Sequence, residues 1–311
     1  VNGFTRFNRA GDTYTNTGSF HVAAGAMLEM QAGGQTFNQD GGTLDIQGTF
    51  NPSSTTFNFN GGDVVGNPMI LSLSTLNIGP AAGAGQFVLR QTSNLSGDLS
   101  SGQFVTVRGD SSNAHVTAAN GFLNNSTLTI ESTDTANSTL VVTTGMLENA
   151  AAATIEFNGG AGTRNLQGSL LNNGTVNVNG FTRFNRAGDT YANTGSFHVA
   201  AGVTLEMQSS GQTFDQDGGT LDIQGTFNPS SSTFNFDGGN VVGNPMILSA
   251  STLNIGPLAD TGEFVLRQTS NLGGDLSSGQ FVTIRGDGNN AFITTPGSFA
   301  NQGSITVETT A

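Results

Sequence analysis

The chain of 311 residues contains neither cysteine nor lysine. The missing cysteine excludes disulfides and thiolate metal sites and leaves the redox compartment open. Nine arginines face 22 acidic residues, for a net charge of −13. This balance argues against binding to nucleic acid or to an anionic membrane surface, because both rely on clustered basic side chains. The sequence predicts an acidic chain without a nucleic-acid partner.

Long apolar runs are also missing. No stretch of about 18 apolar residues could span a bilayer, and no signal peptide opens the chain. We therefore expect no membrane span. The opening residues Val1–Phe4 recur as Val178–Phe181. We expect a fragment of a longer array, with its secretion and anchoring signals elsewhere.

The residues that are abundant favour strands and turns. The chain has 45 glycines, 22 phenylalanines and only 10% charged residues. Helix-forming residues are scarce, whereas β-branched and turn-forming residues dominate. The low charge and the many phenylalanines distinguish the chain from disordered sequences. The composition predicts an all-β protein with a long, thin core.

A long internal repeat divides the chain. The segment that begins Val1-Asn2-Gly3-Phe4 returns at Val178, and the match continues from there toward the last residue. Such similarity indicates a recent tandem duplication. We predict one continuous rod made of two β-helix blocks, residues 1–177 and a truncated second block, residues 178–311.

A shorter period lies inside each block. It consists of two apolar residues separated by one, usually followed by glycine. The seven pairs of the first block are Phe20/Val22, Leu44/Ile46, Leu76/Ile78, Val105/Val107, Leu128/Ile130, Ile155/Phe157 and Val176/Val178. The i, i+2 spacing places both side chains on one face of a strand. If each pair marks one coil, a block has seven coils of about 25 residues.

This pattern predicts a right-handed parallel β-helix. The alternative is a row of β-sandwiches, whose strands also recur at short intervals. Coils of unequal length that end in a similar turn favour a solenoid instead.

The residue types that carry chemistry are sparse. His21, His115 and His198 are too few and too scattered for a zinc site, so we predict no catalytic residue, no metal centre and no cofactor, with incidental calcium at a corner left open. Asp40, Asp45, Asp98 and Asp110 recur as Asp217, Asp222, Asp275 and Asp287. Paired carboxylates cleave glycosidic bonds. Because nearly every acid is copied, however, they indicate a distributed surface property.

Two charged clusters are the candidate ligand-binding sites. Their residues are Arg6, Arg9 and Asp12 with the copies Arg183, Arg186 and Asp189, and the Arg-Gly-Asp ends Arg108 and Asp110 with the copies Arg285 and Asp287. The first cluster could hold a sugar carboxylate through its arginines, or could prevent lateral aggregation of the rods. The tripeptide could bind integrins from an exposed loop, or could result from a glycine required at a corner.

Phrases such as Asp40-Gly41-Gly42-Thr43-Leu44-Asp45-Ile46-Gln47-Gly48 and Asn172-Asn173-Gly174-Thr175-Val176-Asn177-Val178-Asn179-Gly180 resemble bacterial surface β-helix repeat proteins, the filamentous-haemagglutinin and autotransporter-passenger class. The resemblance extends over the whole chain. It implies a non-enzymatic extracellular fibre at the cell surface that serves in adhesion or biofilm cohesion. Unpaired edges at the ends of such a rod also lead us to expect self-association, and we expect surface polysaccharide as a further partner. The alternative is a β-helix that binds or cleaves polysaccharide, as in lyases or phage tail-spikes.

Overall fold

A computed structural model describes residues 1–310, and this part of the chain contains strands but no helix. Two compact units are present, Val1–Arg164 and Asn165–Ala311. Their division does not coincide with the end of the first sequence block at Asn177. The strand β18 (Arg164–Asn172) lies at the division between the units.

The first unit consists of short strands joined by turns. They are β1 (Phe4–Phe7), β2 (Thr13–Asn16), β3 (Ser19–Val22), β4 (Met27–Met30), β5 (Thr36–Ile46), β6 (Thr49–Pro52), β7 (Thr56–Gly66), β8 (Met69–Ser72), β9 (Thr75–Ala82), β10 (Gly85–Arg90), β11 (Thr92–Ser96), β12 (Gln103–Gly109), β13 (Ala114–Ala118), β14 (Phe122–Asn124), β15 (Thr127–Ser132), β16 (Ser138–Asn149) and β17 (Thr154–Asn158).

After β19, the second unit repeats the order of the strands from β1 to β15. Its strands are β19 (Thr175–Val178), β20 (Thr182–Phe184), β21 (Thr190–Asn193), β22 (Ser196–Val199), β23 (Thr204–Met207), β24 (Thr213–Ile223), β25 (Thr226–Pro229), β26 (Thr233–Gly243), β27 (Met246–Ser249), β28 (Thr252–Ala259), β29 (Gly262–Arg267), β30 (Thr269–Gly273), β31 (Gln280–Asp287), β32 (Phe292–Thr294) and β33 (Ser304–Thr310).

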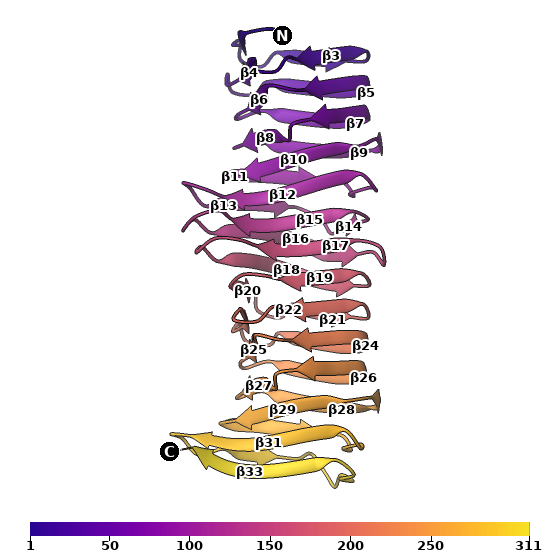
Figure 1. Cartoon of the computed structure of the whole chain (residues 1–311), viewed down its shortest axis with the longest axis vertical. Helices are drawn as coiled ribbons and strands as arrows, with labels where there is room; N and C mark the ends of the chain where they lie inside the picture. The colour runs from indigo at the N-terminus through magenta and orange to yellow at the C-terminus, as the bar shows by residue number, and fades with distance from the viewer. Residues whose placement is uncertain (311) are drawn as a thin grey trace. The chain divides into compact units, whose positions relative to one another are not determined.

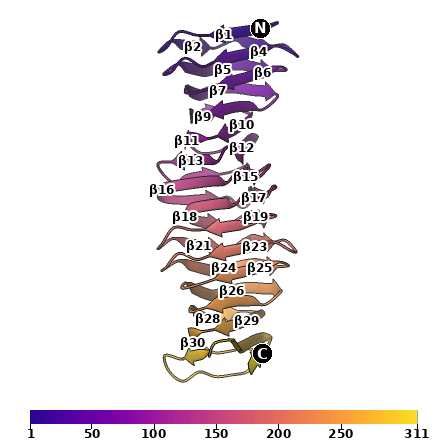
Figure 2. The same ribbon diagram turned by 90° about the vertical axis from the view of Figure 1, so that its left-hand side faces the viewer.

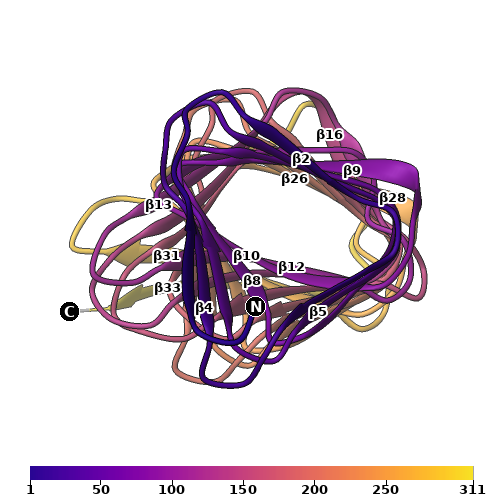
Figure 3. The same cartoon turned by 90° about the horizontal axis from the view of Figure 1, so that it is seen from above.

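The strands of successive coils pair in parallel, as Figure 1 and Figure 2 show within each unit. The coils differ in length: the step from Met69 to its partner Phe87 is short, whereas the step from Thr127 to its partner Thr154 is long. The described residues form about 14 coils of about 22–25 residues. The predicted β-helix is therefore confirmed, and Figure 3 shows the strands surrounding the interior in the view from above.

The coils of the first unit have three faces, each with its own ladder of paired residues. The first face runs from β1 through β4, β6, β8, β10, β12 and β15 to β17. The second contains β2, the first halves of β5 and β7, and then β9, β11 and β13. The third contains β3 and the second halves of β5 and β7.

The predicted marker pairs do not form one series. Leu44 pairs with Val64 on the third face, whereas Leu76 continues the second face from Phe57. The step between Leu44 and Leu76 is therefore not one coil. The first face alone has eight strands before residue 159, so the seven marker pairs undercount the coils of the block. The i, i+2 pattern is the same on every face, and for that reason it could not identify the face.

Aromatic rings fill much of the interior. In the first unit Phe37 stacks on Phe57 with their ring centroids 5.7 Å apart, and Phe57 contacts Phe87 at 5.9 Å. In the second unit Phe214 and Phe234 repeat the stack at 5.6 Å. Such pairs add about 0.5–1.5 kcal/mol each to the stabilisation from burial.

Tight corners require glycine where neighbouring coils approach closely. Gly42 has a φ of +62°, and a Cβ placed there would lie 1.9 Å from the carbonyl oxygen of Gly18 on the preceding coil. Gly219 is in the same situation against Gly195 in the second unit. These glycines let the backbones of two coils meet at the corner.

Candidate functional site

The first predicted cluster is a set of ion pairs. The Nη2 of Arg6 lies 2.6 Å from Oε2 of Glu29 on the next coil, and its guanidinium lies 5.3 Å from the ring centroid of Phe4. Arg9 and Asp12 form a looser pair at 3.6 Å, within one turn. The structure thus places Arg6 and Arg9 in separate ion pairs, because Arg6 takes its partner from the neighbouring coil.

The copy in the second unit has the same partners, and its Arg186–Asp189 pair is closer than the Arg9–Asp12 pair of the first unit. Arg183 pairs with Glu206 at 2.7 Å, and Arg186 pairs with Asp189 at 2.7 Å. The side chain of Asp189 is only 5% exposed, compared with 34% for Asp12. Burial therefore makes Asp189 part of the local structure and leaves little of its carboxylate open to a ligand.

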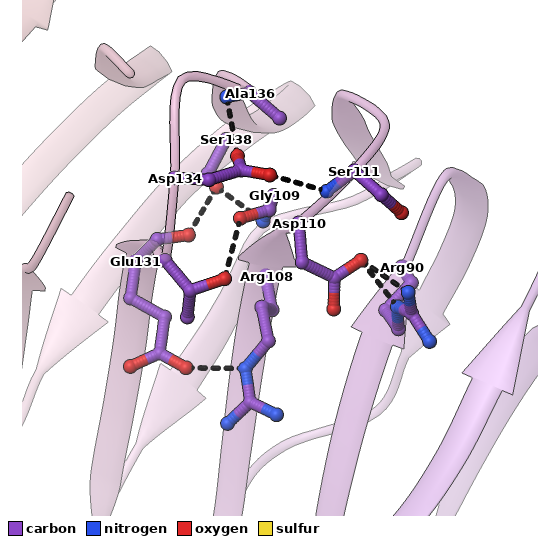
Figure 4. Close-up of polar contacts among 10 residues, drawn as sticks. Arg90, Arg108, Gly109, Asp110, Ser111, Glu131, Asp134, Ala136 and Ser138 are labelled. Carbon is purple, nitrogen blue, oxygen red and sulfur yellow. Dashed lines mark hydrogen bonds and ion pairs between the residues drawn. The ribbon is translucent and has the colours of Figure 1, made fainter. Parts of the chain in front are cut away.

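The Arg-Gly-Asp tripeptides lie at the ends of strands β12 and β31, where their charges are already paired. Arg108 donates to Glu131 on the following coil, and Arg90 on the preceding coil donates to Asp110 (Figure 4). In the second unit Arg285 pairs with Glu308, and Arg267 pairs with Asp287 at 2.6 Å.

The register explains these pairs. Arg90 and Arg108 lie beside each other on adjacent coils, because Leu89 pairs with Val107. Arg108 is in turn opposite Glu131. The two arginines and their two acids thus form one column along the outer surface of the first face. Each charged end of the tripeptide is thus paired with a residue of a neighbouring coil, and integrin binding stays a prediction.

Within the described residues, every arginine except Arg164 has a carboxylate partner. Arg164 is 1% exposed, and it donates to the carbonyl oxygens of Gly160 and Gly162. Its burial lowers the pKa of the guanidinium. Arg164 therefore closes a turn inside the coil instead of presenting a charge to a ligand.

The acids that the sequence analysis singled out act in a similar way. Asp98 accepts a hydrogen bond from the backbone nitrogen of Leu123 at 2.8 Å, and Asp275 accepts one from Ala300 at 2.8 Å. Asp45 accepts from His21 at 2.8 Å, and Asp222 accepts from His198 at 2.9 Å if each Nδ1 carries the proton. These bonds join neighbouring coils.

Asp134 shows the same role most clearly. Its carboxylate accepts the backbone N–H of Ala136 at 2.6 Å and that of Ser111 on the preceding coil at 2.7 Å (Figure 4). These two N–H groups lower the pKa of Asp134, because they stabilise its charged form. The residue fixes a loop between two coils.

One group of acids differs between the units. Asp215, Asp217 and Asp237 of the second unit stand where the first has Asn38, Asp40 and Asn60. Burial raises the pKa of Asp215, and the charge of Asp237 raises it further, although a hydrogen bond from Asn235 opposes the change. Burial also raises the pKa of Asp217, followed by the charges of Asp215 and Asp237. The duplication did not copy this carboxylate cluster.

A set of buried amides, whose members could not be identified individually from the sequence, also joins neighbouring coils. In the first unit Asn16 donates to Gln39 at 2.9 Å, and Asn124 donates to Asn149 at 2.8 Å, inside the coil. In the second unit Asn172, Asn193 and Gln216 form a continuous chain with bonds of 2.7 and 2.9 Å. Each amide satisfies its neighbour on the next coil, as buried polar groups must.

Four fully buried glutamines follow glycine in the sequence, namely Gln35, Gln103, Gln212 and Gln280. Gln103 accepts a bond from the nitrogen of Ser100 and donates to the carbonyl oxygens of Ala82 and Gly83 on the preceding coil. The recurring Gly-Gln pair before a strand was the signal that could have identified them.

No metal centre is assembled among residues 1–310, because no three of their histidine, aspartate and glutamate side chains are placed to hold an ion. Nor does the described chain contain a helix with the length and apolar character needed to cross a bilayer. Comparison with known proteins finds no matching family model, curated protein or solved structure.

Proposed function

We propose that the chain is a segment of a non-enzymatic extracellular fibre on a bacterial surface, which supplies length, stiffness and many weak attachment points. The observation that supports this proposal is the pairing of the charged side chains with other residues of the same chain. The paired arginines and most of the predicted acids bind a neighbouring coil or their own turn. With this arrangement every coil adds ion pairs and hydrogen bonds to its neighbour. Few charged groups gather at one place where they could act as a catalytic site.

Attachment in such a fibre depends on the number of repeats. Each block offers the same outer columns, so one weak contact per block becomes strong only when several act together. Surface polysaccharide fits as the partner, because it also presents a repeating chain of polar groups. Self-association of the fibres would increase the number of contacts further.

The test uses chains with one, two and four complete blocks. We expect the contour length in electron micrographs to rise by roughly 40 Å per block, from eight coils at ~4.8 Å each. Retention of coated beads on bacterial polysaccharide should rise more steeply than the number of blocks. A retention that does not depend on the number of blocks would contradict the proposal.

The second candidate is cleavage of polysaccharide, favoured by the cluster Asp215, Asp217 and Asp237, of which the first unit has only the counterpart Asp40. A carboxyl group with a raised pKa can protonate a glycosidic oxygen while a second carboxylate stabilises the transition state. The release of reducing ends from acidic polysaccharides, with loss of turnover in Asp215→Asn and Asp217→Asn but not in Asp98→Asn, would establish this function. Absence of turnover in the wild-type chain would contradict this second function.

A further inference from the structure

Two columns of uncharged polar side chains run along the outer surface of the second face in the first unit (Figure 2 shows its strands). On β5, β7 and β9 the residues Phe37, Phe57 and Leu76 pair with one another and are buried. Their neighbours in the sequence therefore point outward, and they form one column of Thr36, Thr56 and Thr75 and a second column of Asn38, Asn58 and Asn77. On β2, β11 and β13 the two columns continue with threonine, asparagine and serine only.

The asparagine column is ordered by hydrogen bonds between coils. The Nδ2 of Asn58 donates to Oδ1 of Asn38 at 2.8 Å, and the Nδ2 of Asn77 donates to Oδ1 of Asn58 at 2.7 Å. An asparagine amide has two N–H donors and two acceptor lone pairs on its oxygen. Asn58 thus uses one donor and one lone pair within the column and keeps one of each for a partner outside the chain.

The absence of charge distinguishes these columns from the outer surfaces of the other two faces. The first face carries the column of Arg90, Arg108 and Glu131, and the third face carries the pair of His21 and Asp45. The net charge of −13 opposes the close approach of two chains. The uncharged columns are therefore the surface of the first unit on which two copies meet with the least repulsion.

The size of this surface determines how strongly it can bind. With strands ~4.8 Å apart and alternate residues of a strand ~7 Å apart, the two columns cover about 400 Å² over the strands from β2 to β13. A stable protein interface buries about 800 Å² on each partner. One such surface therefore supports weak association, and several in one long array would bind strongly together.

The second unit has the same columns with added negative charge. Asp215 stands in place of Asn38, and Asp237 stands in place of Asn60. The hydrogen bonds between coils are retained, because Asn235 donates to Asp215 at 2.7 Å and Asn254 donates to Asn235 at 2.8 Å. The two substitutions thus keep the geometry of the surface and make it repel an acidic partner.

We propose that the threonine and asparagine columns of the first unit dock against the same columns of a second copy of the chain, so that rods associate side by side. This inference rests on the proposed fibre, for which it names the surface that joins neighbouring rods. A second copy fits this surface because its columns have the same spacing between coils and the same donors and acceptors. Salt should strengthen such an interface by screening the net charge, whereas it weakens an interface made of ion pairs.

The test is sedimentation equilibrium of the whole chain at increasing concentration. We expect the average mass to rise above that of one chain, and to rise further when salt is added. Thr56→Glu places a charge in the threonine column and should weaken the association by at least about tenfold, because like charges would meet across the interface. Thr106→Glu adds the same charge at an outward-facing position of β12 on the first face, and this matched control should change the association little. Melting temperatures in dilute solution establish that both variants fold.

A variant with stronger association gives a second, independent measurement. Asp215→Asn with Asp237→Asn gives the second unit the residues of the first and should strengthen the association clearly more than Asp260→Asn with Glu263→Gln, which removes two exposed charges elsewhere.

Three results would overturn the proposal: a single-chain mass at every concentration, equal effects of Thr56→Glu and Thr106→Glu, or equal effects of the two double variants. Retention of a monomeric chain on an uncharged polysaccharide, lost in Thr56→Glu, would also overturn it and would assign the columns to a glycan. The contour length and bead retention expected of the fibre do not require this contact, so its failure would leave the proposed function intact.

Discussion

A buried glutamine closes the same kind of turn four times along the chain. In each case its side-chain oxygen accepts a backbone N–H from the preceding turn, as Gln103 does from Ser100 at 2.8 Å and Gln280 does from Ser277 at 2.8 Å. The side-chain nitrogen donates to the coil before. One residue thus satisfies backbone groups of two coils that water cannot reach.

Replacement of Gln103 by leucine should therefore destabilise the chain. The change keeps the volume similar but leaves three backbone groups without their partner, and we expect a loss of about 2–4 kcal/mol in the free energy of unfolding. Urea denaturation measures it. Gln86→Leu on the exposed side of β10 is the control and should change stability by less than about 0.5 kcal/mol. Equal effects of the two substitutions would refute this role for Gln103.

Asp215 provides a prediction with a pH dependence. Its pKa is raised by burial, so the folded chain binds this proton more tightly than the unfolded chain does. Stability contributed by the protonated form is therefore present at low pH and decreases as the pH rises through the folded-state pKa. Asp215→Asn should raise the melting temperature at pH 7 and have little effect at pH 3.

The first unit supplies the reciprocal variant. Asn38 occupies the equivalent position and accepts a bond from Asn58 at 2.8 Å. Asn38→Asp should lower the melting temperature at pH 7 more than at pH 3. If both variants shift the melting temperature equally at the two pH values, burial of the carboxylate is not the cause.

At the level of the elements, the stacked rings of the interior connect strands β5, β7 and β10. Phe57 is fully buried between Phe37 and Phe87. Phe57→Ala should cost about 3–5 kcal/mol, because the loss of the ring leaves a cavity that parallel strands cannot close. Phe104→Ala, at a position 44% exposed, should cost far less. Calorimetry of both variants measures the difference, and similar losses would contradict a stabilising role for the aromatic stack.

The sequence predicted the class of these elements but not their faces. Alternation of apolar and polar residues, as in Leu128 and Ile130, specifies a strand with one side buried. It carries no label for the first, second or third face, and so Leu44 and Leu76 were placed in one series. Phe4 is an aromatic residue of strand β1 but is 64% exposed. The ring of Phe4 lies beside the guanidinium of Arg6. Arg6 forms an ion pair with Glu29 on the outer surface.

The candidate site was less predictable than the fold. The Arg-Gly-Asp tripeptide is visible in the sequence, but the partners Arg90 and Glu131 become neighbours only through the register of two coils that differ in length. The Gly-Gln pair before a strand is also visible in the sequence, but burial of the glutamine was not, because a polar residue after glycine normally indicates an exposed turn. In both cases the missing information is which residues a coil places above one another.

For the whole molecule, stability should vary along the chain. In a solenoid each coil is supported mainly by its neighbours, so a coil with an open side exchanges its amides first. We expect the fastest exchange of strand amides in β32, where Phe292 is 61% exposed, and the slowest in β7, β9 and β12. Exchange followed by mass spectrometry tests this order. Uniform protection would show that the chain unfolds in a single step.

The unequal lengths of the coils also bear on how the chain finds its alignment. If all coils were the same length, a growing stack could slip by one coil and keep most of its hydrogen bonds. Here a slip by one coil would place the short step from β10 to β12 against the longer step from β12 to β15, and the turns would no longer meet. A stack with this error is therefore less stable than the correctly aligned stack. A slip by one whole block costs little stability, since the second block offers nearly the same partners. The characteristic misfolding error of a long array should therefore be the exchange of whole blocks between chains.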